Sequence, residues 1–141
     1  MLLKNLSINE MFEQAKSLAQ QLNKKSIILL EGDLGAGKTT FAGQIINAMS
    51  TKEMQVTSPT FNIISVYEFD NKEIWHFDLY RITNKMELFE IGIEEAFENA
   101  ISIIEWPQIA MDLIPKEHIH IELKISQENQ DLRDITINYK G

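Results

Sequence analysis

Cysteine is absent from this chain, and proline, glycine and arginine are scarce, with three, six and two copies among 141 residues. Without cysteine the chain has neither disulfides nor thiolate metal ligands, which suits the reducing cytoplasm, where we expect the protein to be. The few proline and glycine residues form no linker, and 141 residues is a length typical of one domain. We therefore expect a single domain over residues 1–141.

Long hydrophobic runs and an excess of positive charge are also missing. No apolar stretch approaches the roughly 20 residues that cross a bilayer, and residues 1–22 mix polar side chains into their apolar pattern, so we expect neither membrane insertion nor export. The net charge of -8 argues against direct binding of a nucleic acid backbone. The two arginines, Arg81 and Arg133, are too few for the phosphate clamp of a kinase with a mobile lid.

The most informative segment that is present runs from Gly32 to Thr40 and reads Gly-Asp-Leu-Gly-Ala-Gly-Lys-Thr-Thr. It follows an apolar run at residues 27–30 and precedes apolar residues at helical spacing, which is the context of a phosphate-binding P-loop. In such a loop, glycines let backbone amides approach the phosphates at a helix N-terminus. A chance match is the alternative, and the flanking strand and helix weigh against it.

The P-loop pattern assigns a task to each of its polar residues. Lys38 would reach the β- and γ-phosphates of a nucleotide, and the Thr39 hydroxyl would bind a Mg²⁺ ion that bridges them. The predicted nucleotide-binding residues are Asp33, Leu34, Gly35, Ala36, Gly37, Lys38, Thr39 and Thr40.

A nucleotide hydrolase also needs a carboxylate at the end of a neighbouring strand, to bind the metal and to orient the attacking water. Residues 101–105 form an apolar strand that ends in Glu105, and Trp106 and Pro107 follow it. This is the shape of a Walker B element with Glu in place of Asp, and the alternative that it outweighs is a solvated residue at a strand end. Trp106 is either a half-buried core residue or an anchor for a partner.

Asp78 is a second candidate carboxylate. It lies in the segment His-Phe-Asp-Leu-Tyr-Arg at 76–81, where strand alternation places His76, Asp78 and Tyr80 on one face. Its carboxylate either faces the phosphates, or pairs with Arg81 or caps the next helix. Residues 57–60, Thr-Ser-Pro-Thr, are either a plain turn or a loop that senses the γ-phosphate.

Two features near the C-terminus receive little weight. His118 and His120 form a pair on one strand face, but no third metal ligand with suitable spacing is evident. The charged positions beyond them are interpreted as the solvated side of an edge hairpin without a function; they are Glu122, Lys124, Glu128, Asp131 and Arg133.

Hydrophobic periodicity predicts the elements around these motifs. A first helix over 11–22 follows Ser7, an expected N-cap with Glu10 three residues on. Further elements are predicted as strands at 27–30, 61–69, 74–80, 101–105, 118–125 and 134–139, and as helices at 41–49, 85–89 and 94–98. The predicted fold is α/β, a P-loop NTPase-like domain with a mixed, mainly parallel central sheet flanked by helices.

Five ordered blocks resemble the TsaE (formerly YjeE) family, the small ATPase components of bacterial tRNA threonylcarbamoyladenosine biosynthesis. The resemblance covers nearly the whole chain, and the blocks are residues 32–40, 56–61, 76–81, 90–95 and 104–107. It implies a weakly hydrolysing ATPase that uses ATP and Mg²⁺ and works with TsaD and TsaB, reaching tRNA only through that complex. Two other classes stay open from the residues alone: a small-molecule P-loop kinase, and a nucleotide-dependent scaffold without essential hydrolysis.

The resemblance also implies residue roles. Lys38, Asp78, Glu105 and Trp106 would be catalytic, with Thr39, Glu105 and Asp78 at the metal and Trp106 close to the partner-facing surface. The 57–60 loop would be the switch. The sequence departs from the family pattern at Met11, where a Thr is common near the adenine end of the pocket, which leaves the base contacts open.

Overall fold

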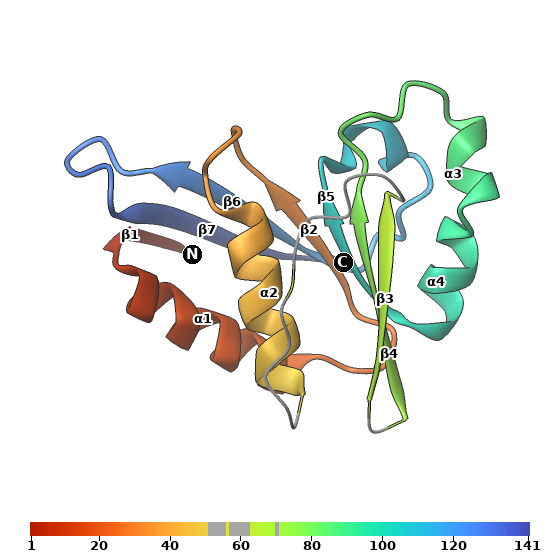
Figure 1. Cartoon of the computed structure of the whole chain (residues 1–141), viewed down its shortest axis with the longest axis horizontal. Helices are drawn as coiled ribbons and strands as arrows, with labels where there is room; N and C mark the ends of the chain where they lie inside the picture. The colour runs from red at the N-terminus through yellow and green to blue at the C-terminus, as the bar shows by residue number, and fades with distance from the viewer. Residues whose placement is uncertain (51–55, 57–62, 70) are drawn as a thin grey trace.

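The computed structural model describes residues 1–50, 56, 63–69 and 71–141, and within them a seven-stranded sheet forms the centre (Figure 1). The strand order is β1-β7-β6-β2-β5-β4-β3. The strands are β1 (Leu2–Leu6), β2 (Ile27–Glu31), β3 (Ile64–Phe69), β4 (Lys72–Asp78), β5 (Ile101–Glu105), β6 (His118–Ile125) and β7 (Arg133–Lys140).

The four central strands, β6, β2, β5 and β4, are parallel, and the outer strands pair antiparallel with their neighbours. This explains the continuous apolar runs of β2 and β5, since strands in the middle of a parallel sheet are covered on both faces. The mixed, centrally parallel sheet confirms the predicted fold class.

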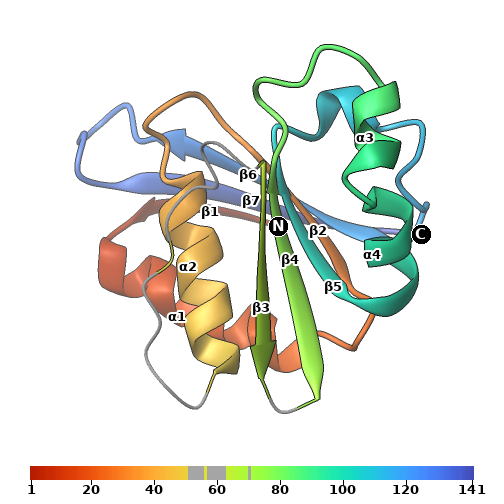
Figure 2. The ribbon, with the colours of Figure 1, turned by 45° about the vertical axis from the view of Figure 1, so that its right-hand side comes forward.

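Helices cover the two faces of the sheet (Figures 1 and 2). The helices are α1 (Ile8–Gln21), α2 (Lys38–Met49), α3 (Met86–Glu90) and α4 (Ile93–Asn99), with a short 3₁₀ turn η1 (Pro107–Ala110). One hydrophobic core lies between the sheet and helices α1 and α2, where Phe41 and Ile45 of α2 pack with Ile28 of β2 and Ile103 of β5. On the other face, a second core joins Leu88 and Ile93 to Leu29 and Ile104, because alternate strand residues point to opposite faces.

Several local predictions are confirmed. Helix α1 begins after Ser7, whose hydroxyl accepts a hydrogen bond from Glu10 N at 3.2 Å while Ser7 N donates to Glu10 Oε1 at 3.0 Å. This reciprocal pair is the expected capping box. The strands at 101–105 and 118–125 have the predicted bounds. Among the helices of the described residues, none combines the length and apolar character that spanning a bilayer requires.

Other expectations need correction. Strand β1 is absent from the predicted elements, because its five residues form a strand only by pairing with β7. The register of this pair shifts between Leu3 and Leu6. The strand predicted at 74–80 ends at Asp78, after which Leu79 N donates to Glu105 O. The hairpin of β6 and β7 is not at an edge, since β1 lies outside β7.

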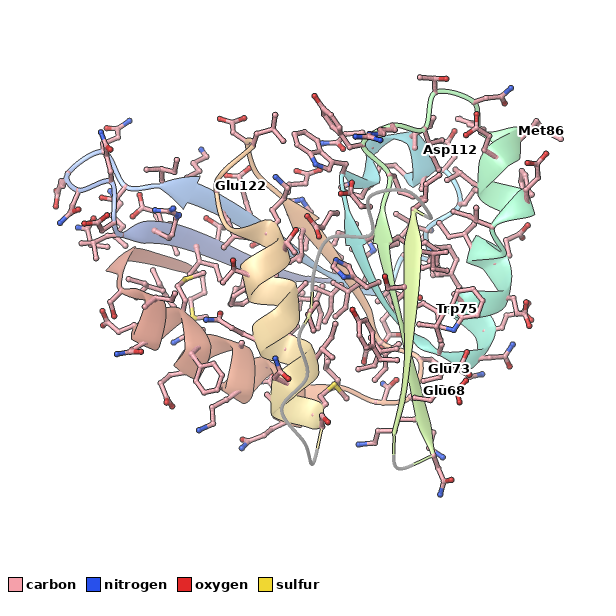
Figure 3. All side chains as sticks on the ribbon, in the orientation of Figure 1. Glu68, Glu73, Trp75, Met86, Asp112 and Glu122 are labelled. Carbon is pink, nitrogen blue, oxygen red and sulfur yellow. The ribbon has the colours of Figure 1, made fainter. Side chains whose placement is uncertain are left out.

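Two polar pairs lie on the side of the sheet that α3 and α4 cover. Lys85, just before α3, pairs with Asp112, and Trp75 Nε1 donates to the Glu73 carboxylate on the same strand. Figure 3 shows Asp112 near the start of α3 and Trp75 on the side of β4 that faces α4. Neither pair includes a predicted site residue.

Candidate functional site

The glycine-rich loop (Gly32 to Thr40) joins the carboxyl end of β2 to the N-terminus of α2. A bond of 3.0 Å from Ala36 N to Asp33 O closes its turn, and Gly37, with φ +101°, is the N-cap residue of α2. No side chain caps this helix among the described residues. The first amides of α2 are therefore left for another acceptor, and the helix dipole favours an anion there.

Two glycines of the loop are needed for different reasons, which leads to a prediction. A Cβ on Gly32 would lie 2.5 Å from Leu123 O of β6, whereas a Cβ on Gly35 would meet nothing within 4 Å and would only strain a backbone with φ +84°. We expect Gly32→Ala to lower the free energy of unfolding by about 3 kcal/mol through the backbone clash, and Gly35→Ala by about 1 kcal/mol. Urea denaturation of both variants measures this, and equal losses would contradict the close contact with β6.

Lys38 is the first residue of α2, and its side chain is only 5% exposed. Its Nζ donates to Asp33 O at 3.0 Å and to Gly32 O, and lies 4.3 Å from the centre of the Trp106 ring. Burial lowers the pKa of Lys38, and the carboxylates of Glu105, Asp78 and Asp33 oppose that shift. The loop therefore holds an ammonium group between its own carbonyls and an aromatic face.

Glu105 is the last residue of β5 and lies beside Thr39 of the glycine-rich loop. Both of its carboxylate oxygens accept from Thr39 Oγ1 at 3.0 Å, and His76 Nε2 donates to Glu105 Oε2 at 2.6 Å. Glu105 is 2% exposed and His76 is fully buried, and His76 Nδ1 has no hydrogen-bond partner in the described part of the chain. The interpretation of Glu105 as a solvated residue is therefore wrong.

Asp78 lies next to Glu105 in register on the neighbouring strand β4, so both side chains leave the sheet at the same edge. Its Oδ1 accepts from Tyr80 N at 3.1 Å, which turns the chain away from the sheet. The Tyr80 ring stands 4.8 Å from that of Trp106, whose backbone has a left-handed φ of +56°. Asp78 thus accepts a hydrogen bond in the local turn and is also one of the three carboxylates that act on Lys38, together with Glu105 and Asp33.

The other predicted loop residues lie around this cluster. Asp33, Leu34, Gly35 and Thr40 are exposed, and Ala36 is buried. The predicted switch at 57–60 lies outside the described residues.

The donor set suits a hard cation. Thr39, Glu105 and Asp78 offer hydroxyl and carboxylate oxygens, which are the ligands that Mg²⁺ prefers. No group of three or more His, Cys, Asp or Glu in the described residues is arranged to hold a metal, so the protein ligands offered here are two carboxylates and one hydroxyl. His118 Nδ1 donates to Pro115 O, and His120 pairs with Glu31 at 3.0 Å, so both imidazoles have partners within the protein.

A cavity of about 140 Å³ opens beside the loop, between α1, α2 and the turn that follows β6. Its apolar wall includes Ile8, Met11 and Phe41, and its polar side includes Asp131 and Arg133. The cavity therefore extends the site from the N-terminus of α2 toward α1. Met11 lines this cavity. The family resemblance implies that position 11 lies near the adenine end of the nucleotide pocket.

Arg133 is the residue that sequence reasoning missed. Its Nε donates to Ala36 O at 2.9 Å and its Nη2 to Gly35 O at 3.3 Å, so it is no solvated hairpin residue. No local pattern indicates this contact, because it joins positions 97 residues apart through the order of the strands.

Comparison with known proteins gives a consistent result. A family model described as "Threonylcarbamoyl adenosine biosynthesis protein TsaE" matches residues 6–135. The chain is 42% identical over 121 residues to a Rickettsia typhi protein named "tRNA threonylcarbamoyladenosine biosynthesis protein TsaE", covering 86% of this chain and 84% of that one. A Bacillus subtilis protein of the same name is 33% identical over 128 residues, covering 90% and 78%. The crystal structure of Bacillus subtilis YdiB aligns with a TM-score of 0.77 and 27% identity, covering 100% of this chain and 86% of that one.

Proposed function

The chain belongs to the TsaE family of threonylcarbamoyl adenosine biosynthesis proteins, and we propose that its task in this tRNA modification is to bind ATP with Mg²⁺ and hydrolyse it slowly. One observation carries the proposal. Lys38, Thr39 and Glu105 meet at the N-terminus of α2, with the Thr39 hydroxyl 3.0 Å from both Glu105 oxygens. A cation, a hydroxyl and a carboxylate at a helix N-terminus are the groups that nucleotide phosphates and their metal require.

Each residue then has a defined task. Lys38 would give up its carbonyl partners for oxygens of the nucleotide's phosphates, and Thr39, Glu105 and Asp78 are the residues that would hold the metal. Bound Mg²⁺ would neutralise charge that develops on the phosphates. Glu105 also orients the attacking water, and its bond from His76 fixes the carboxylate in place. Trp106 covers the Lys38 ammonium and limits its contact with water.

The acidic composition supports action through partners. A net charge of -8 disfavours direct tRNA binding, so we propose a complex with TsaD and TsaB through which tRNA is reached. A kinase role is disfavoured further, because Arg133, one of two arginines, is engaged by backbone carbonyls.

Calorimetric titration tests the proposal. We expect ATP with Mg²⁺ to bind more tightly than GTP, and TsaD and TsaB from the same organism to strengthen that binding. An ATP affinity that does not change when TsaD and TsaB are added would contradict the proposed complex, but it would still support the nucleotide site. Failure to bind either nucleotide, alone and with the partners, would overturn the whole proposal.

A further inference from the structure

Arg133 is tied to two segments at once. Besides its bonds to Ala36 O and Gly35 O, its Nη1 donates to Gln130 O at 2.7 Å and to Leu132 O at 3.0 Å. The guanidinium group thus joins the turn between β6 and β7 to the glycine-rich loop. Figures 1 and 2 show these two connections side by side at one end of the sheet.

Arg133 and Lys38 hold different parts of that loop. Lys38 binds the carbonyls of Gly32 and Asp33 at its start, and Arg133 binds those of Gly35 and Ala36 at its end. When Lys38 turns to a phosphate, its two carbonyls lose a partner. The bonds of Arg133 need not change, so Arg133 is the lasting anchor of the loop.

Anchoring a carbonyl also directs an amide. A trans peptide unit is planar, with its C=O and the following N–H pointing in opposite directions. Fixing Ala36 O toward Arg133 therefore turns the Gly37 N–H away from the guanidinium, at the N-terminus of α2 where an anion is favoured. The planar fork of arginine can hold two neighbouring carbonyls, which a lysine ammonium does less rigidly.

We propose that Arg133 is a positioning residue of the nucleotide site, which holds the glycine-rich loop in the form that receives a nucleotide's phosphates and makes the β6–β7 turn part of that site. This inference rests on the proposed function. Arg133 acts through the backbone of the loop, so its effect should be the same for the di- and the triphosphate.

The test compares Arg133→Gln with Arg133→Lys and with Arg81→Gln, the same change at an exposed arginine. Titration with ATP and ADP, well below the melting temperature of each variant, should show both dissociation constants raised about tenfold for Arg133→Gln. Arg133→Lys should recover part of the loss, and Arg81→Gln should bind as the unchanged protein does.

Hydrogen exchange without nucleotide gives a second readout. The amides of residues 35–38 should exchange roughly tenfold faster in Arg133→Gln, since the loop opens more often. A lower melting temperature with unchanged affinity and unchanged exchange would mean a merely structural role and overturn the inference. If the unchanged protein binds neither nucleotide, the proposed function fails and this inference falls with it; if it binds both and Arg133→Gln does too, this inference alone fails.

Discussion

Replacing Lys38 with alanine should weaken ATP binding by on the order of 100-fold or more, which amounts to loss of binding at ordinary protein concentrations. The substitution removes the one lysine that the structure places inside the glycine-rich loop, with Nζ 3.0 Å from Asp33 O. Charge-assisted bonds to phosphate are about twice as strong as neutral ones, and the helix N-terminus alone supplies only partial charge.

The fold should tolerate this change. Lys38 is buried, and a buried ammonium group carries a desolvation cost that its removal relieves. Circular dichroism and thermal melting should therefore show a folded protein. Lys140→Ala, at an exposed position on β7, is the matched control. ATP affinity that stays within a few-fold of the unchanged protein in Lys38→Ala would be incompatible with phosphate binding at this loop.

Glu105→Gln should lower the rate of ATP hydrolysis by on the order of 100-fold while ATP affinity changes much less. The amide preserves the shape of the side chain and can still bond with Thr39 and His76, but it lacks the charge that holds the metal and orients water. Single-turnover hydrolysis and titration measure the two quantities separately. Glu98→Gln, exposed on α4, serves as the control.

Glu105→Ala is the harsher variant. Within the described residues His76 is fully buried and its Nδ1 has no hydrogen-bond partner, so this variant would leave neither ring nitrogen bonded there. We expect the free energy of unfolding to fall by about 2 kcal/mol. Chemical denaturation measures this loss. Equal loss of ATP affinity in the Lys38 and Glu105 variants would contradict the division of labour between them.

Local pattern was sufficient for the elements that carry the site. The apolar runs before Gly32 and before Glu105 gave β2 and β5, and the glycine spacing gave the loop between β2 and α2. Each of these signals lies within one short segment of the chain, so it can be read without knowing which segments pack together. The predicted roles in phosphate and metal binding stay predictions, as does the switch at 57–60.

The relations between distant segments could not be read from local pattern. Strand alternation placed His76 beside Asp78 on one face, but only the register of β4 against β5 brings His76 to Glu105. The sequence pattern groups Arg133 with the other charges of a hairpin, and only the strand order brings it to the loop. Pairing across a sheet depends on the whole topology, which explains both omissions.

The tether from Arg133 to Ala36 also affects the order in which the protein can assemble. Its two ends are 97 residues apart, so a nascent chain on the ribosome has made the loop long before it has made the anchor. Contacts of such separation form late, because the intervening chain must be closed first. The loop should therefore reach its final conformation only after β6 has paired with β2 and Arg133 has been made.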